Sequence, residues 1–216
     1  MLTGIYCSNT GLNAMAQKMN TISNNLANVN TEGYKQEKIS FKPFLNKTNG
    51  VVPAKTAVDF RTGSPKETGR EYDFAINGDA FFVVQTEQGD RYIRNGSFSC
   101  DASGYLTDKN GNRIAGVSGS IKMVDGKPDQ KFSLVTIQDK EHLVRQADGF
   151  MATDQAEVSP ADYEVSQGKL ENSNVDLINN LSEMIITSRN YAFNSKILMS
   201  QDEMLTRAAN DIGSLK

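Results

Sequence analysis

The chain has 216 residues, a formal net charge of −3 and a sequence pI of about 5.3, which suits one or two compact units. The slightly acidic balance argues against a nucleic-acid-binding protein, because such proteins usually present a basic face. It gives no support for an anionic membrane surface as a partner.

Residues that build metal sites and disulfides are sparse. Cys7 and Cys100 lie far apart and form no C-x-x-C pair, which predicts neither a disulfide framework nor a zinc site. The single histidine, His142, has no Cys or His nearby and is interpreted as an ordinary surface or strand residue. We therefore expect no metal, no cofactor and no small-molecule substrate.

Catalytic arrangements are not recognisable in the sequence. It contains no G-x-S-x-G, no P-loop and no H-E-x-x-H. A Ser-His-Asp triad would have to be built on His142, and nothing near this residue suggests that role. Acidic pairs such as Asp101 with Asp108 fall at predicted turns, where Asp commonly bonds the local backbone. We predict that the chain is not an enzyme.

The N-terminal segment does not resemble a secretory signal. MLTGIYCSNTGLNAMAQ has neither a basic segment nor a continuous apolar segment. No stretch approaches the ~20 apolar residues of a membrane span. If the protein leaves the cytosol, we expect a route other than the general secretory one.

Residues 1–34 are predicted to form an N-terminal assembly helix. Two series of apolar residues recur every seven positions and interleave as an a/d heptad pattern, with one polar lapse at Ser8. Gly33 is predicted to end this helix, because glycine readily takes the left-handed conformation. The apolar stripe consists of Ile5, Leu12, Met15, Met19, Ile22, Leu26 and Val29.

Residues 35–59 show no clear period and are predicted to be an extended connector. The sequence leaves open whether this connector orders into a hairpin or strand that contacts adjacent subunits.

Residues 60–168 are predicted to form a central antiparallel β-domain or small barrel. AFFVVQ and DRYIRNGSFS flank TEQG, which predicts a hairpin around Gly89, and turns are predicted at 101–104, 110–111 and 125–126. Period-two alternation makes core candidates of Phe74, Ile76, Phe82 and Val84.

Residues 169–216 are predicted to form a C-terminal assembly helix. Its heptad series is Leu177, Met184, Tyr191, Leu198, Leu205 and Ile212. The second series starts at Leu181 and is mixed in polarity, and further apolar residues widen the face: Ile178, Ile185, Ile186, Phe193, Ile197 and Met204. Ser173 and Asp176 have the spacing of an N-terminal cap. The predicted fold is α+β, with long terminal helices as a coiled-coil-like pair that flanks a central antiparallel all-β domain.

The first helix is weak by intrinsic propensity, because asparagines compete with helix formation. One buried apolar stripe recovers less free energy than ordering the helix costs, so the helix needs neighbours on more than one side. Apolar stripes at both ends suit polymerisation through the termini, which we expect to be mobile in the monomer and to order on assembly. The alternative is an intramolecular helix pair packed on the β-domain.

Asparagines in the first helix are predicted to form interhelical or intersubunit hydrogen bonds, although a solvated face is the alternative. The predicted assembly interface comprises Ile5, Leu12, Met15, Met19, Ile22, Asn24, Asn25, Leu26, Asn28, Val29, Asn30, Leu177, Leu181, Met184, Tyr191, Leu198, Leu205 and Ile212.

Several segments resemble the axial proteins of the bacterial flagellum, which form its rod and hook. SNNLANVNTEGYK (23–35) is similar to their N-terminal signature, and FAINGDAFFVVQ (74–85) and RNGSFSCDASGYL (94–106) are similar to two central blocks. QGKLENSNVDLINNLSEMI (167–185) and SRNYAFNSKILMSQDEML (188–205) resemble the C-terminal segment. Departures at Ala80, Ile93 and Asn179–Asn180 blur which member the chain resembles, and residues 116–165 carry no clear signature.

The resemblance implies a structural subunit of the flagellar rod, proximal or distal. Its terminal helices would polymerise into the hollow axial drive shaft that transmits motor torque to the hook. The implied partners are further copies of the chain, other rod and hook proteins, and the flagellar type III export apparatus. The implied location is the basal body in the cell envelope, reached without a cleaved signal peptide. Because hook proteins usually carry a larger outer insertion, the alternatives are a compact hook protein or a non-flagellar tube or adhesin-like subunit.

Overall fold

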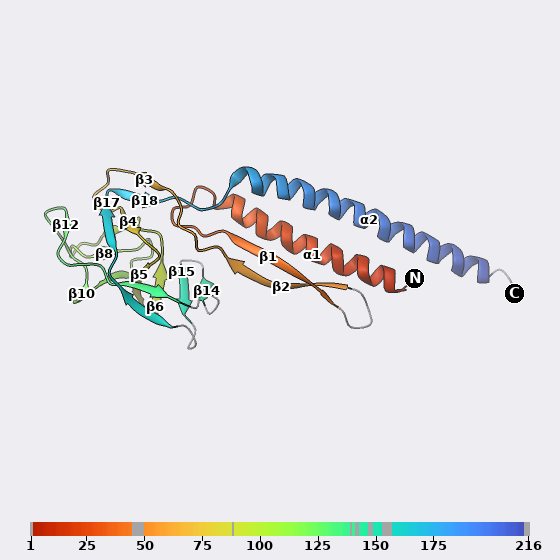
Figure 1. The fold of residues 1–216 in the computed structure, drawn as a ribbon, viewed down its shortest axis with the longest axis horizontal. Coiled ribbons are helices and arrows are strands. Elements are labelled where there is room, and N and C mark those ends of the chain that lie inside the picture. Colours follow the sequence, from red (N-terminus) through yellow and green to blue (C-terminus); the bar gives the residue numbers. More distant parts are fainter. Residues whose placement is uncertain are drawn as a thin grey trace. The chain divides into compact units, whose positions relative to one another are not determined.

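The structure, a computed structural model, describes residues 2–44, 50–87, 89–138, 140, 143–146, 149–152 and 157–213 (Figure 1). His142 lies outside the described residues. The chain forms two compact units, which we name the helical unit (1–29, 36–59 and 175–216) and the β unit (30–35 and 60–174). Neither described helix is long and apolar enough to span a membrane.

The order of the elements confirms the α+β class, with N- and C-terminal helices flanking a largely antiparallel β region. The helices are α1 (Leu2–Ala27) and α2 (Leu177–Gly213). The strands are β1 (Glu37–Phe44), β2 (Gly50–Val58), β3 (Pro65–Glu67), β4 (Phe74–Asn77), β5 (Phe81–Thr86), β6 (Gly89–Ile93), β7 (Ser99–Cys100), β8 (Leu106–Thr107), β9 (Arg113–Gly116), β10 (Gly119–Ser120), β11 (Met123–Val124), β12 (Lys127–Pro128), β13 (Leu134–Ile137), β14 (Leu143–Gln146), β15 (Gly149–Ala152), β16 (Val158–Ala161), β17 (Glu164–Gln167) and β18 (Lys169–Glu171).

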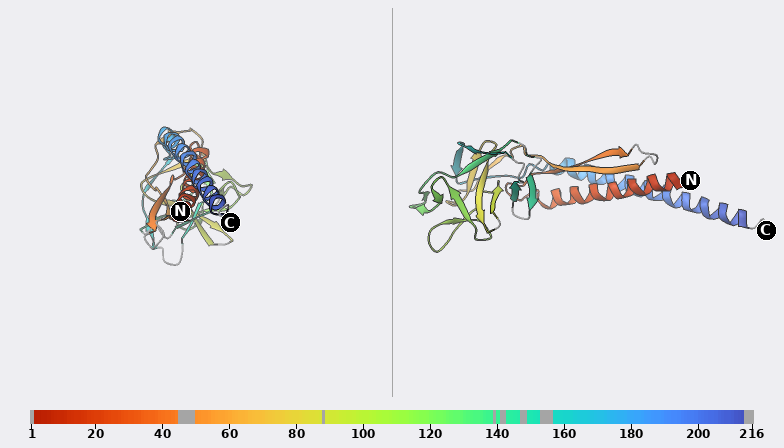
Figure 2. Two further views of the ribbon diagram at one scale, coloured as in Figure 1. Left: turned by 90° about the vertical axis from the view of Figure 1, so that its right-hand side faces the viewer. Right: turned by 90° about the horizontal axis from the view of Figure 1, so that it is seen from below.

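Within the helical unit, α1 lies between α2 and the two-stranded sheet of β1 and β2 (Figures 1 and 2). β1 pairs antiparallel with β2, with Glu37 opposite Val58 and a register shift between Ser40 and Phe41. The segment predicted as an extended connector therefore contains this sheet. Because α2 and the sheet both contact α1, the chain itself supplies the neighbours on two sides that the weak helix needs.

The helix ends differ from the sequence predictions. α1 ends at Ala27, six residues before the predicted stop, and the Asn28 N–H donates to Asn24 O (3.2 Å) and Asn25 O (3.1 Å) in a tightened last turn. Gly33 has the expected positive φ, +68°, but lies in the loop beyond. α2 is capped by Asp176, whose Oδ1 accepts from the Asn179 N–H (3.0 Å), so the prediction of a cap at position 173 is wrong.

The β unit contains a mostly antiparallel sheet in the order β14-β15-β6-β5-β9-β8-β7, to which β10 adds on β9 and β13 adds on β5. The smaller pairs are β17 with β4, β18 with β3, and β11 with β12. The predicted hairpin at Gly89 is confirmed, since β5 pairs β6 from Thr86 opposite Gly89.

Both faces of β5 are covered. Phe82 packs against Phe98 and Phe132 in the main apolar core, and Phe81 contacts Phe60 and Phe150 on the other face. The predicted core residues of β4 and β5 are all buried, which confirms them. Period-two alternation missed the second face, because it assumes a strand with one solvated side.

Candidate functional site

Two close contacts between α1 and α2 each join a glycine of α1 to a polar residue of α2. An added Cβ on Gly4 would lie 3.1 Å from Gln201 Nε2, and one on Gly11 would lie 2.9 Å from Asn194 Nδ2, so the helices run antiparallel and close together. On α2 this polar face repeats every seven residues at Asn180, Thr187, Asn194 and Gln201. The apolar seam of a coiled coil is therefore not confirmed.

Asn25 joins the three elements of the helical unit. Its side chain is 1% exposed, its Nδ2 donates to Glu37 O (2.8 Å), and its Oδ1 accepts from the Glu37 N–H (2.9 Å). The Asn25 carboxamide thus pairs with both the N–H and the carbonyl of Glu37, as the peptide group of a neighbouring strand would. Nδ2 also lies 3.4 Å from Oδ1 of Asn180, whose own Nδ2 donates to Asp176 O (2.7 Å).

The neighbouring asparagines are placed differently. Asn24 and Asn30 are exposed, and Asn28 donates to the backbone carbonyl of Asn24 (2.9 Å) within α1. The structure therefore contains an interhelical hydrogen bond through Asn25, and hydrogen bonds from the other three to a second subunit stay a prediction.

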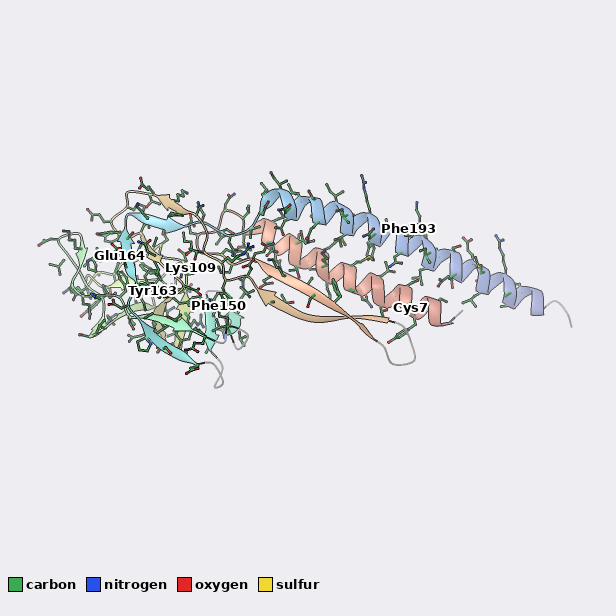
Figure 3. All side chains as sticks on the ribbon, viewed as in Figure 1. Cys7, Lys109, Phe150, Tyr163, Glu164 and Phe193 are labelled. Atoms are coloured by element: carbon green, nitrogen blue, oxygen red, sulfur yellow. The ribbon has the colours of Figure 1, made fainter. Side chains whose placement is uncertain are left out.

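The face of α2 that points away from α1 carries large, exposed apolar side chains. Ile178 is 76% exposed and Phe193 is 67% exposed; Figure 3 locates Phe193 on α2. We name this surface the outer α2 face, and it comprises Ile178, Leu181, Ile185, Ile186, Phe193, Met199 and Met204. Exposed apolar surfaces of this kind are typical of protein–protein interfaces.

The predicted interface residues fall into three groups. Ile22 is buried, and half-buried positions are Ile5, Leu12, Met15, Met19, Leu26, Val29, Met184, Leu198 and Leu205. Leu177, Leu181 and Tyr191 are exposed, and Ile212 lies within α2. The second predicted series of α2 starts one residue after the buried polar series, so Leu181 belongs to the outer α2 face.

The β unit contains a buried ionic cluster that sequence reasoning missed. Oε1 of Glu171 accepts from Lys35 Nζ (2.7 Å) and from the Gly63 N–H (2.8 Å), and Oε2 accepts from Arg94 Nε. Lys35 Nζ also donates to Arg61 O (2.8 Å). We name these residues the Glu171 cluster. Their charged side chains are almost inaccessible, at 2% exposed for Lys35, 5% for Arg94 and 4% for Glu171.

Arg94 extends the cluster to the turn between β4 and β5. Its guanidinium donates to the carbonyls of Ala80, Gly78 (2.5 Å) and Ile76 (3.5 Å). The planar, multiply donating group suits such a set of carbonyls better than an ammonium would. It thereby fixes the backbone of the A-I-N-G-D-A segment against Glu171.

Two buried cations share one buried carboxylate in this cluster. Burial lowers the pKa of Lys35 below its ordinary value, the Glu171 carboxylate opposes that shift, and the Arg94 cation adds to it. Removing the Lys35 charge leaves the neutral Glu171–Arg94 pair, whereas removing the Glu171 charge leaves two buried cations side by side.

Segment 30–35 can pass close to the backbone of Arg94 and Asn95 because residue 33 is a glycine. Its φ is +68°, and an added Cβ would lie 2.5 Å from the Asn95 N and 2.7 Å from the Arg94 carbonyl carbon. Its N–H donates to Glu171 O (2.7 Å). Only glycine fits both the conformation and the close approach.

A groove of about 770 Å³ opens on the β unit, beside β17 (Figure 3 labels Tyr163 and Glu164). Phe74, Phe132 and Leu134 line its apolar part. Lys131 Nζ lies 3.4 Å from Asp162 Oδ1 in an exposed ion pair at this groove, which makes a weak contact.

The described residues contain no group of three or more His, Cys, Asp or Glu that could hold a metal ion. Asp101 and Asp108 bond the backbone of their own turns, Asp101 to the Tyr105 N–H (2.8 Å) and Asp108 to the Asn112 N–H (2.8 Å). Those backbone bonds lower the pKa of Asp101, with Tyr105 the largest contributor. These carboxylates therefore serve local turn structure.

Comparison with known proteins gives two matches to family models. The model of the flagella basal body rod protein matches residues 5–35, and that of the flagellar basal body rod FlgEFG protein C-terminal region matches residues 166–211. Lys35 closes the first matched region and Glu171 lies in the second, so the Glu171 cluster joins the two.

Full-length relatives are similar along the whole chain. The flagellar basal-body rod protein FlgG of Bacillus subtilis (strain 168) is 28% identical over 261 aligned residues, covering 97% of this chain and 99% of the relative. The flagellar basal-body rod protein FlgF of Rhizobium meliloti (strain 1021) is 26% identical, covering 99% of both. The flagellar hook-basal body complex protein FlhO of Bacillus subtilis (strain 168) is 25% identical, covering 100% of both.

Proposed function

This chain belongs to the flagellar basal-body rod protein family, and we propose that it is a structural subunit of the bacterial flagellar rod. Two of the three relatives named above are rod proteins matched over nearly their whole length, and the two family models match segments near both ends of the chain. The alternatives of a compact hook protein and a non-flagellar tube or adhesin-like subunit are not favoured.

The proposed mode of assembly rests on the exposure of the outer α2 face. α1 already contacts α2 and the β1–β2 sheet of its own chain, whereas the apolar side of α2 is uncovered. Burying its seven exposed apolar side chains, each already partly covered, would contribute roughly 5–10 kcal/mol, about half the value for full burial. That free energy is available to a second copy, and several such contacts per subunit offset the cost of association.

We propose that copies of the chain polymerise through their terminal helices into a hollow shaft that transmits torque from the motor to the hook. This role uses the division predicted from the sequence, with assembly helices at 1–34 and 169–216, a connector at 35–59 and a β-domain at 60–168. The connector carries the β1–β2 sheet, and the C-terminal helix itself begins at Leu177. Because Gly4 lies opposite Gln201, the start of α1 at Leu2 is level with about residue 203 of α2, and α2 extends beyond that point by about 15 Å, at 1.5 Å per residue. The sequence predicted that both termini are mobile before assembly. We now propose that this mobility is confined to the part of α2 that extends past α1.

Export and location follow from the same proposal. We propose that the chain reaches the basal body through the flagellar type III export apparatus, without a cleaved signal peptide, and joins other rod and hook proteins in the cell envelope. Cys7 and Cys100 are not joined in a disulfide, so no such crosslink would hinder threading of the chain as an unfolded polypeptide. We also propose a purely structural role with no catalysis.

The location of the protein in purified basal bodies tests the assignment. An epitope-tagged chain, detected by immuno-electron microscopy, is expected between the motor end and the hook junction. Label confined to the hook beyond that junction would favour a hook protein, and basal bodies without label would overturn the rod assignment. An untagged strain is the control for background.

A further inference from the structure

The Glu171 cluster lies where the chain enters and leaves the β unit. The chain enters at residue 30, leaves after Lys35, returns at Phe60 and leaves again after Asn174. The segments beside these points bond to one another inside the β unit. Asn174 Nδ2 donates to Arg61 O (2.9 Å), and the Asn174 N–H lies 3.3 Å from Tyr34 O.

We propose that Glu171 is a latch, which makes the ordering of residues 30–35 conditional on the ordering of residues 169–174. Its backbone carbonyl accepts from the Gly33 N–H (2.7 Å), and its carboxylate accepts from Lys35 Nζ (2.7 Å). One residue of the C-terminal segment therefore holds the N-terminal segment through both its main chain and its side chain.

The carboxylate is what makes the two cations compatible. Lys35 and Arg94 are both nearly inaccessible and both donate to Glu171. Without that negative charge, two like charges would be buried beside each other, which a low-dielectric interior strongly disfavours. Lys35 can avoid this burial of like charges by leaving the cluster, because its side chain is flexible and the segment that carries it, 30–35, is only six residues long.

The two segments that the latch joins contribute no residue to the main apolar core. The main core cluster draws its residues from positions 74 to 134 and includes none from 30–35 or 169–174. Releasing residues 30–35 therefore removes no side chain from that core. Local opening of this kind needs less free energy than global unfolding.

The order of the residues along the chain gives the latch a direction. Glu171 follows Arg94 by 77 residues and Lys35 by 136 residues. In a chain that emerges N-terminus first, both cations wait for a carboxylate that arrives near the end. The N-terminal segment thus stays open until the C-terminal segment is in place, whatever route carries the chain, so this inference goes beyond the proposed function.

Hydrogen exchange of the full chain, resolved by mass spectrometry, tests the latch. The variants are Glu171→Gln, which removes the charge and keeps the shape, and Lys35→Met, which removes one cation and leaves the Glu171–Arg94 pair. Glu67→Gln is the matched control, because Glu67 sits on β3 opposite β18 and makes an exposed ion pair with Lys169 (3.1 Å).

We expect Glu171→Gln to speed exchange in residues 30–35 and 169–174 at least tenfold and to leave the β5 peptide protected. Lys35→Met is expected to speed exchange in 30–35 alone, and the control is expected to match the wild type. Unchanged protection of 30–35 in Glu171→Gln would overturn the proposal. So would equal loss in β5, since the cluster would then be part of the general core. If Glu171→Gln does not fold, Lys35→Met provides the test. The latch is refuted if residues 30–35 of Lys35→Met are as protected from exchange as in the wild type, or if β5 loses protection to the same extent.

Discussion

Replacing Asn25 by alanine should destabilise the helical unit, whereas replacing its neighbour Asn24 should not. Asn25 is 1% exposed and makes two hydrogen bonds to the backbone of Glu37, while Asn24 is exposed. The two residues are adjacent in the same helix, so the substitutions have the same chemistry and nearly the same helix propensity. Any difference between them reports the contacts of the side chain.

The magnitude follows from the groups left behind. Asn25→Ala removes two hydrogen bonds to Glu37, each worth about 1 kcal/mol net, and the longer one to Asn180. It also leaves the N–H and carbonyl of Glu37 without these partners in a half-buried site. Adding that desolvation cost gives a loss of roughly 2–4 kcal/mol in the free energy of unfolding. Asn24→Ala should be neutral or stabilising by up to about 0.7 kcal/mol, because alanine has the higher helix propensity.

Urea unfolding followed by circular dichroism at the helix band measures this difference, because α1 and α2 dominate that signal. For a urea dependence of about 2 kcal/mol/M, Asn25→Ala lowers the midpoint by about 1–2 M. Asn25→Asp should behave similarly, because a carboxylate cannot donate to the Glu37 carbonyl. Equal midpoints for Asn25→Ala and Asn24→Ala would refute the role given to Asn25.

Three further predictions concern the β unit, each measured by urea unfolding with near-ultraviolet or fluorescence detection. Glu171→Gln should cost about 3–5 kcal/mol, because it leaves two buried cations without a carboxylate, and Arg94→Met should cost a similar amount, because it leaves the carbonyls of Ala80, Gly78 and Ile76 without their donor. Lys35→Met should cost less than about 2 kcal/mol, and equal costs for Glu171→Gln and Lys35→Met would contradict the sharing of one carboxylate. Because the pKa of Lys35 is lowered from 10.5, the folded chain loses this proton before the unfolded chain does, so this group makes stability rise with pH from the lowered pKa towards 10.5. That rise should be missing in Lys35→Met. A pH dependence of stability identical to that of the wild type would contradict the lowered pKa of Lys35. Gly33→Ala should cost at least about 3 kcal/mol, since it adds a backbone clash to an unfavourable φ, whereas Gly69→Ala, with φ +70° and open space around it, should cost only about 1–2 kcal/mol.

Local periodicity was sufficient for the fold class and for much of the core. The heptad spacing predicted both helices, and period-two alternation identified the buried residues on one face of β4 and β5. The β1–β2 sheet was missed for a physical reason. A register shift between Ser40 and Phe41 interrupts the alternation of β1, so the strand carries no continuous pattern.

The functional surfaces needed contacts that sequence spacing does not encode. On α2, polar Asn180 and Thr187 are buried while apolar Ile185 and Phe193 are exposed, so a rule that places apolar residues inside assigns the wrong face to the helix pair. From the sequence alone, Lys35 and Glu171 look like surface residues, because each is the other's partner and 136 residues separate them along the chain. The available signal was their position near Gly33 and Gly168, which both have positive φ, and Gly33 also marks a close backbone approach.

Assembly through the outer α2 face is tested most directly by Phe193→Glu, with Phe193→Leu as the matched control that keeps an apolar side chain. Phe193 is 67% exposed, so both purified variants should unfold at the wild-type urea concentration. Electron microscopy of basal bodies from cells that carry only the variant is the measurement. We predict no completed rod or hook with Phe193→Glu and normal structures with Phe193→Leu. Complete rods and normal swimming with Phe193→Glu would contradict assembly through this face.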